Sequence, residues 1–164
     1  MLRRRDPLAN PEPLIRRVYS YAAYRLGDGP DAEDATSETM LRAVRYRQSY
    51  DASVGTEQAW LLGIARRVVG EQLEARRAAG RIPELAAIAD FDEAAAAVER
   101  VALREALAAL AQDERDLLAL RYGADLAVKD VALILGERTN AVEVALHRVV
   151  AKLRAQLSAR SPAG

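Results

Sequence analysis

The sequence lacks several features that would assign it to particular classes of protein. It has no cysteine, which excludes disulfide bonds and thiolate metal sites and fits a reducing compartment. No apolar run approaches the length that spans a bilayer, and the basic start is followed by no apolar stretch of the kind a secretory signal needs. Aromatic residues are few, at 5% of the chain. We therefore expect a soluble cytoplasmic protein without membrane association.

A net charge is also absent, because 24 basic side chains balance 24 acidic ones. The charges are nevertheless segregated along the chain. Acidic residues outnumber basic ones in 28–60, whereas basic residues prevail in 61–82 and again in 137–164. Local sign matters more than the sum, because salt screens each patch from distant ones. Two basic patches suit a protein that meets nucleic acid at two places, although solvated Arg-rich helix faces would give the same pattern.

Strong helix formers dominate what is present, and the apolar residues recur with helical spacing. The first helical stripe follows Asn10 and Pro11, an N-cap residue and a proline suited to the first helical position. Asp31 is expected to cap a second helix, and a third is expected to run from about Trp60, a core position, to Arg77. The sequence therefore predicts an all-α fold.

The composition changes after the third predicted helix, where Gly, Pro and alanines occur without a helical period. We expect two small helical domains, residues 10–78 and 95–158, joined by a flexible linker at 79–94. In the second domain Val101 is expected to face inward, and Asp113 is expected to cap a further helix.

The last third of the chain has a more specific layout. A short helix is predicted at Val128–Leu135, and Gly136 follows it in the position of a C-terminal capping glycine. Asn140 is placed to cap a longer helix, with Glu143 as its partner in a capping box. Glu143 would alternatively accept a hydrogen bond from a cytosine amino group. A short helix, a glycine turn and a longer helix form the layout of a helix-turn-helix, which also occurs as plain helix packing.

Two blocks of this sequence together resemble the extracytoplasmic-function (ECF) sigma factors, the small alternative class within the sigma-70 family. DAEDATSETMLRAV with AWLLGIARR resembles sigma region two, and ALAALAQDERDLLALRYGADLAVKDVALILG with NAVEVALHRVVAKLR resembles region four. The resemblance covers roughly residues 14–77 and 98–157. It implies that domain 10–78 docks on RNA polymerase and recognises and melts the minus-ten promoter element. It also implies that domain 95–158 recognises the minus-thirty-five element.

The resemblance further implies which residues make each contact. The residues matching the polymerase-docking surface are Asp34, Glu38, Thr39 and Arg42. Those matching the minus-ten surface are Tyr50, Ser53, Thr56, Arg66, Arg67, Arg76 and Arg77. Those matching the minus-thirty-five surface are Arg138, Thr139, Asn140, Glu143, Val144, His147, Arg148 and Lys152. On the residues alone, the acidic cluster is better explained as a helix start stabilised by the helix dipole, whereas the loop at 50–56 is equally a plain connector.

The function that we expect is that of an alternative sigma factor. Its partners would be core RNA polymerase, through the β′ clamp and the β flap, promoter DNA and an anti-sigma factor. The alternative is a stand-alone helix-turn-helix transcriptional regulator that uses only residues 127–157 and leaves 31–77 unexplained. A third class is an enzyme or a protein-interaction bundle. No Ser/His/Asp set, phosphate-binding glycine loop or metal-ligand cluster occurs, so we expect no catalytic activity, cofactor, metal or small-molecule substrate.

Overall fold

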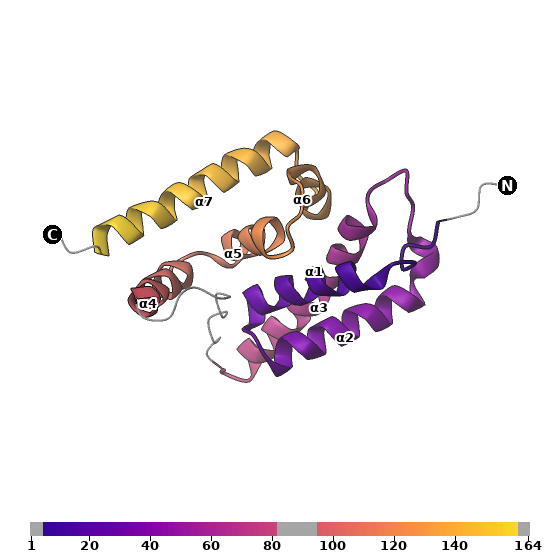
Figure 1. Cartoon of the computed structure of the whole chain (residues 1–164), viewed down its shortest axis with the longest axis horizontal. Helices are drawn as coiled ribbons and strands as arrows, with labels where there is room; N and C mark the ends of the chain where they lie inside the picture. The colour runs from indigo at the N-terminus through magenta and orange to yellow at the C-terminus, as the bar shows by residue number, and fades with distance from the viewer. Residues whose placement is uncertain (1–4, 82–94, 161–164) are drawn as a thin grey trace.

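The computed structural model describes residues 5–81 and 95–160, which are helical and contain no strand. The first group of helices is α1 (Pro11–Leu26), α2 (Pro30–Arg45), the 3-10 turn η1 (Arg47–Ser49) and α3 (Glu57–Ala78). The second group is α4 (Ala95–Ala108), α5 (Gln112–Leu118), the π-helical turn η2 (Ala119–Gly123), α6 (Val128–Leu135) and α7 (Thr139–Arg160) (Figure 1). The all-α prediction is confirmed for these residues. Most of the predicted linker, residues 82–94, lies outside the described residues.

The first group is a three-helix bundle in which each helix contacts the other two. Pro11 stands in the first turn of α1 as predicted, but the Asn10 side chain makes no capping hydrogen bond. The prediction that Asp31 caps α2 is wrong, because this helix begins at Pro30, after Gly29, and Asp31 lies in its first turn. Gly29 has φ +131°, a conformation that side chains with a Cβ rarely adopt. The side-chain cap is found at α3 instead, where Thr56 accepts a hydrogen bond from the Ala59 amide at 3.1 Å.

The helix-turn-helix of the second group has the predicted bounds at its short helix. Val128–Leu135 forms α6, and Gly136 ends it in the left-handed conformation at φ +66°. The longer helix begins at Thr139, with the Val142 amide donating to the Arg138 carbonyl at 3.1 Å. Asn140 therefore lies inside the first turn, and the predicted capping box with Glu143 is wrong.

Two further predictions for the second group need correction. The helix α5 begins at Gln112, so Asp113 lies within its first turn and does not cap it. Val101 is 53% exposed, although its spacing suggested an inward position. Ala106 and Leu110 are buried, and α4 packs on α7.

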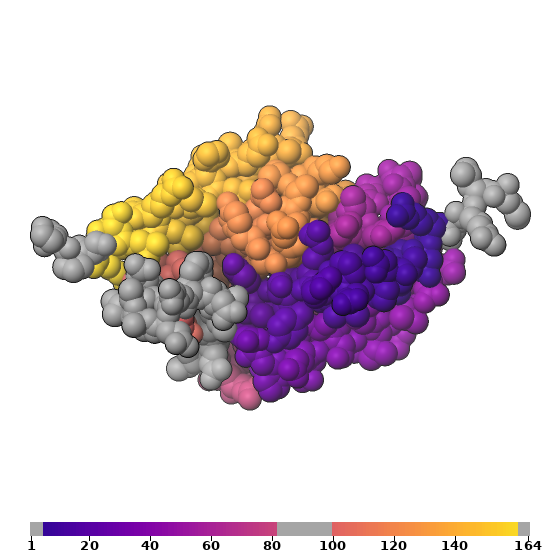
Figure 2. Space-filling view, in the orientation of Figure 1, coloured from indigo at the N-terminus to yellow at the C-terminus, as the bar shows by residue number. Residues whose placement is uncertain are grey.

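The second group of helices packs directly against the first. α1 contacts η2 and α3 contacts α6, and the buried apolar residues of both groups form one continuous core. The Arg17 guanidinium on α1 donates to the carbonyls of Ala124 and Asp125 at 2.9 and 2.7 Å. In Figure 2 the orange surface of the second group lies against the indigo surface of α1. The outer face of α2 lies on the side of the bundle away from α6 and α7 (Figure 1).

Candidate nucleic-acid interface

The exposed face of α2 carries only part of the residue set predicted for polymerase docking. Asp34 is exposed, and Glu38 is half-buried. Thr39 is fully buried at 0% exposure, with its hydroxyl donating to the Ala35 carbonyl at 2.7 Å. Burial removes Thr39 from the predicted contact surface. Leu41, which the sequence analysis left out, is 64% exposed on the same helix.

Arg42 holds α2 against α3 through two carboxylates. Its Nε donates to Glu38 at 2.8 Å, and its two terminal nitrogens donate to the two carboxylate oxygens of Glu71 at 3.1 and 2.7 Å. These hydrogen bonds raise the pKa of Arg42 above its usual value, and the bond to Glu71 has the larger effect. The hydrogen bond from Arg42 likewise lowers the pKa of Glu71. Arg42 is therefore engaged within the bundle, with only 26% of its side chain exposed.

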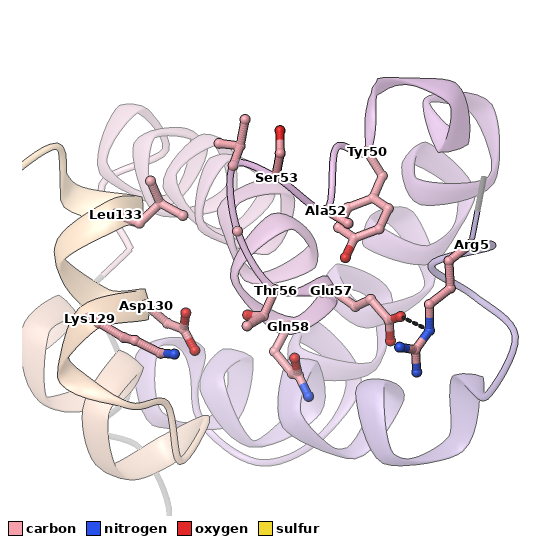
Figure 3. A pocket seen from close by; sticks show the side chains of 12 residues that line it. Arg5, Tyr50, Ala52, Ser53, Thr56, Glu57, Gln58, Lys129, Asp130 and Leu133 are labelled. Carbon is pink, nitrogen blue, oxygen red and sulfur yellow. Dashed lines mark ion pairs between the residues drawn. The ribbon is translucent and has the colours of Figure 1, made fainter. Parts of the chain in front are cut away.

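The loop at 50–56 borders a cleft of about 650 Å³ between the two groups of helices. Tyr50, predicted to contact minus-ten DNA, is buried and packs edge-on against Trp60, with ring centroids 5.7 Å apart. Ser53 is exposed and is held by Asp51, which accepts from its amide at 2.9 Å and from its hydroxyl at 2.7 Å. Figure 3 shows the opposite wall of the cleft, where Lys129, Asp130 and Leu133 stand on α6.

Trp60 itself was predicted to be a core position, and the structure places it at the edge of the core. It is partly buried, and its indole Nε1 donates to the Ser49 hydroxyl at 3.2 Å. This bond ties η1 to α3 and so fixes the start of the loop that follows.

The four arginines predicted for minus-ten DNA divide into two pairs. Arg67 and Arg77 are exposed, and Arg77 pairs with Glu74, one turn away on the same helix. Arg76 is mostly buried and donates to the Leu26 carbonyl at 3.0 Å and to the Asp31 carboxylate. Arg66 pairs with Asp116 of the second group. Within the part of the chain that the structure describes, the first pair therefore makes no ion pair with another helix, whereas Arg66 and Arg76 each do.

Asp116 on α5 is the centre of a buried cluster that the sequence analysis missed. Its carboxylate accepts from the Tyr21 hydroxyl and from the Arg66 Nε, the latter at 2.6 Å, and the Arg25 Nε lies 3.7 Å away. Burial, followed by the nearby charge of Asp116, raises the pKa of Tyr21 well above its usual value. A sequence signal existed, since Asp116 shares a helical face with Leu120, four residues later in an apolar run.

The N-terminal half of α7 presents its predicted minus-thirty-five residues on one exposed surface. The exposed residues are Arg138, Thr139, Asn140, Glu143, Val144, His147 and Arg148. Buried Val142, Leu146 and Val149 hold the opposite face of α7 in the core. Lys152 lies further along the helix and pairs with Glu114 on α5 at 3.1 Å. The structure thus brings together all the residues predicted to contact the minus-thirty-five element except Lys152, whose amino group is paired with Glu114.

Two negative findings apply to the part of the chain that the structure describes. No group of three or more His, Asp or Glu side chains there is arranged to hold a metal ion. Among the described helices, none is both long enough and apolar enough to cross a membrane.

Comparison with known proteins gives two family matches within the chain. Residues 12–79 match the family Sigma-70 region 2, and residues 100–153 match the family Sigma-70, region 4. The ECF RNA polymerase sigma factor SigK of Mycobacterium ulcerans is 32% identical over 152 residues, which cover 87% of this chain and 81% of SigK. The ECF RNA polymerase sigma factor BldN of Streptomyces coelicolor is 30% identical over 151 residues. That match covers 83% of this chain but only 54% of BldN, so the chain spans about half the length of that relative.

A solved structure has the same fold. The sigma factor RpoE of Bartonella quintana, crystallised with the anti-sigma factor NepR, superposes with a TM-score of 0.70 at 20% identity. The superposition covers 90% of this chain and 94% of the RpoE chain.

Proposed function

The chain belongs to the ECF sigma factors of the sigma-70 family, and we propose that its two groups of helices divide polymerase docking and promoter recognition between them. As an alternative sigma factor the chain directs transcription initiation by RNA polymerase. In the proposal, α2 docks on core polymerase, the loop at 50–56 and α3 meet the minus-ten element, and α7 reads the minus-thirty-five element. Nucleotide addition belongs to the polymerase, so the chain needs no catalytic residues of its own.

The observation that carries this proposal is the pair of family matches, one on each group of helices and in the order of the family. A stand-alone regulator would need only the α6–α7 unit. The region 2 match accounts for residues 12–79, which that alternative leaves without a role.

For polymerase docking we propose an exposed stripe on α2. Asp34, Glu38, Leu41 and Arg45 are spaced by four, three and four residues, which places them on one side of a helix. Asp34 and Arg45 are exposed, and Leu41 adds an apolar centre to a charged surface. A buried apolar contact surrounded by charges is the usual composition of a protein–protein interface.

For promoter contact we propose that exposed guanidinium groups hold phosphates while α7 reads base edges. Arg67 and Arg77 on α3 and Arg148 on α7 are exposed and suited to phosphate contacts. Glu143 on α7 supports a specific prediction about the DNA sequence. It does not act in a capping box, and its side chain is exposed. A carboxylate in the major groove accepts from the amino group of cytosine, so Glu143 predicts a cytosine in the minus-thirty-five element.

Two further parts of the proposal rest on the family. RpoE of Bartonella quintana was solved with the anti-sigma factor NepR, and we expect an anti-sigma partner for this chain as well. A cytoplasmic location follows from the proposed work on core RNA polymerase.

The docking proposal is tested by the affinity for core RNA polymerase. The variant Asp34→Ala/Glu38→Ala should bind core at least about tenfold more weakly, the loss expected from a few contacts at the centre of an interface. The matched control is Glu12→Ala/Glu74→Ala, which removes two exposed carboxylates of the same domain outside α2. The control should bind like the unmodified chain. Absence of core binding by the folded, unmodified chain would refute the function itself.

The base-reading proposal is tested by promoter selection with the holoenzyme. The unmodified chain should select a cytosine at one minus-thirty-five position, and Glu143→Ala should relax that preference about tenfold or more, as one good base contact contributes. Glu137→Ala removes an exposed carboxylate just before α7 and should leave the preference unchanged. An identical preference in the two variants would refute the assignment of Glu143.

A further inference from the structure

We propose that a cavity between α1, α3 and α5 binds a small phosphorylated ligand, with the buried guanidinium of Arg25 as its principal contact. The cavity has a volume of about 370 Å³, which is at the small end of the range for ligand sites in proteins. Tyr21 and Arg25 line it from α1, and Asp116 lines it from α5. Among the described residues, none lines both this cavity and the cleft beside the loop at 50–56. Such a site needs neither polymerase nor DNA, so it stands apart from the proposed function.

The Arg25 side chain is buried, yet it has few polar partners. It is 8% exposed, and its Nε is buried without a hydrogen-bond partner. The Asp116 carboxylate lies 3.7 Å from this nitrogen, which is too far for a hydrogen bond. Asp116 already accepts from the Tyr21 hydroxyl and from the Arg66 Nε. Among the described residues, the Arg25 guanidinium lines the cavity without a hydrogen bond, although every N–H group of arginine is a donor.

A second guanidinium near Arg25 increases the local excess of positive charge. Burial lowers the pKa of Arg115 on α5, and the nearby charge of Arg25 lowers it further. The Arg115 Nε is also buried without a hydrogen-bond partner. A histidine or a carboxyl group in such surroundings would become neutral, but a guanidinium stays protonated in proteins. Both groups therefore remain charged, and an anion bound in the cavity would offset their repulsion and supply the acceptors that they lack.

The charge balance around the cavity favours a doubly charged ligand. Four guanidinium groups and two carboxylates line the cavity or lie beside it: Arg25, Arg66, Arg67, Arg115, Asp113 and Asp116. Four positive charges less two negative charges leave a balance of +2. A phosphate monoester carries nearly the opposite charge at neutral pH, and its oxygens match the forked donors of arginine. The ligand class that fits is therefore a small molecule with a phosphate group.

The rest of the cavity can hold the remainder of such a ligand. Arg66 uses its Nε for Asp116, at 2.6 Å, and 44% of its side chain is exposed, so its terminal nitrogens can serve as further donors to the phosphate. Val69 and Gln112 add an apolar and a polar contact to the lining. A volume of about 370 Å³ exceeds what an inorganic phosphate needs, since one water molecule takes about 30 Å³ of the liquid. The cavity therefore has room for a small organic group beside the phosphate.

The first test is calorimetric titration of the full chain with pyrophosphate, which serves as the probe for the phosphate group. We expect saturable binding of one pyrophosphate per chain at constant ionic strength. Arg25→Met removes the charge but keeps a long side chain, and it should weaken binding at least about tenfold, the loss expected for one hydrogen bond to a charged group. Arg16→Met is the matched control, because Arg16 lies on the same helix with 71% of its side chain exposed, and it should bind like the unmodified chain. Absence of saturable binding by the unmodified chain, or equal binding by Arg25→Met, would overturn the proposal.

A second pair of variants leaves Arg25 in place and carries the test if Arg25→Met does not fold. Gly70 lines the cavity from α3, and a Cβ at this position would meet nothing within 4 Å. Gly70→Asp places a carboxylate beside the guanidinium groups, so it should weaken pyrophosphate binding at least about tenfold by like-charge repulsion and by competing for the same donors. Gly70→Ala adds a side chain without charge and should bind like the unmodified chain. Equal binding by these two variants would show that pyrophosphate binds outside the cavity.

The last measurement distinguishes a free ligand from the DNA backbone as the source of the phosphate, because Arg66 and Arg67 also belong to the surface proposed for minus-ten DNA. Promoter DNA is titrated into the holoenzyme formed by the unmodified chain and by Arg25→Met. We expect less than about a twofold change in DNA affinity, since the Arg25 side chain is only 8% exposed whereas Arg67 is exposed. A loss of DNA binding as large as the loss of pyrophosphate binding would overturn the assignment to a free ligand and give the cavity to the DNA backbone. Failure of the unmodified chain to form a holoenzyme would refute the proposed function, while the pyrophosphate titrations, which need no polymerase, would still decide on the site.

Discussion

Arg76 and Arg77 are sequence neighbours that the structure assigns to opposite roles, and this difference is open to direct measurement. The Arg76 side chain is 10% exposed and joins the end of α1, the start of α2 and the end of α3 through the Leu26 carbonyl and Asp31. The Arg77 side chain is 69% exposed and, among the described residues, its ion pair is with Glu74 on its own helix. We predict that Arg76→Ala unfolds the bundle more easily, whereas Arg77→Ala does not.

The magnitude follows from what each side chain touches. A hydrogen bond to a charged group contributes about 1.5–3 kcal/mol, and Arg76 makes two such bonds. Two features reduce the sum: Asp31 is half exposed to water, and the buried Arg76 Nη1 has no hydrogen-bond partner in the structure. We therefore expect Arg76→Ala to lower the free energy of unfolding by about 2–3 kcal/mol. For Arg77→Ala an exposed pair predicts a change below about 0.5 kcal/mol.

The assay is urea denaturation followed by the fluorescence of Trp60, the one tryptophan of the chain, which lies in the same bundle. For a chain of this size, a loss of about 2 kcal/mol corresponds to a melting point about 4–8 °C lower. Arg76→Lys keeps the charge but not the forked geometry, so it should fall between the unmodified chain and the alanine variant. Equal stability of Arg76→Ala and Arg77→Ala would refute the assignment of Arg76 to structure.

Two further predictions concern the helix-turn-helix and the α2–α3 ion pair. Gly136→Ala should lower the free energy of unfolding by about 1–2 kcal/mol, because φ is +66° at this position. Gly70→Ala, inside α3, should instead raise the free energy of unfolding by up to about 1 kcal/mol. Urea denaturation of both variants measures these changes, and changes of the same sign in the two variants would contradict the prediction. Arg42 lowers the pKa of Glu71 in the folded state, so this pair stabilises the fold above the usual pKa of 4.5 and the contribution is lost as the pH falls below it. Since Glu71 is largely exposed, the loss should stay below about 1 kcal/mol, and a Glu71→Gln chain should not show it when stability is measured against pH.

Helices with a clear apolar period were predictable because their signals are local. Val128–Leu135 with Gly136 was predicted with the correct bounds, since an apolar stripe, a length and a left-handed glycine all lie within nine residues. The N-terminal caps were less predictable. Asp31, Asp113 and Asn140 are all good capping residues, but each lies one or two residues inside its helix. Each helix extends past the residue expected to cap it, so the capping preference did not decide where the helix starts.

The division of side chains between surface and interior was predictable only where an apolar stripe marked it. Thr39 lies in the predicted docking set by sequence, yet it is buried because its small side chain faces the bundle and bonds its own helix. Asp116 was missed for the opposite reason, since a carboxylate in a helix is normally solvated and its partners come from positions 21, 25 and 66. Such contacts join residues distant in sequence, and no local pattern specifies them.

The same distant contacts change what the charge pattern means. The basic segment after residue 60 suggested nucleic acid, but Arg66 and Arg76 are each paired with a carboxylate from another helix. Fewer guanidinium groups are therefore available to DNA phosphates than the number of arginines in the sequence implies. Each phosphate contact that is not made lowers the affinity for DNA and also lowers the dependence of that affinity on salt. It follows that the isolated chain should bind DNA weakly. Promoter binding would then depend on polymerase holding both groups of helices near the DNA, because tethering two weak sites raises their effective concentration.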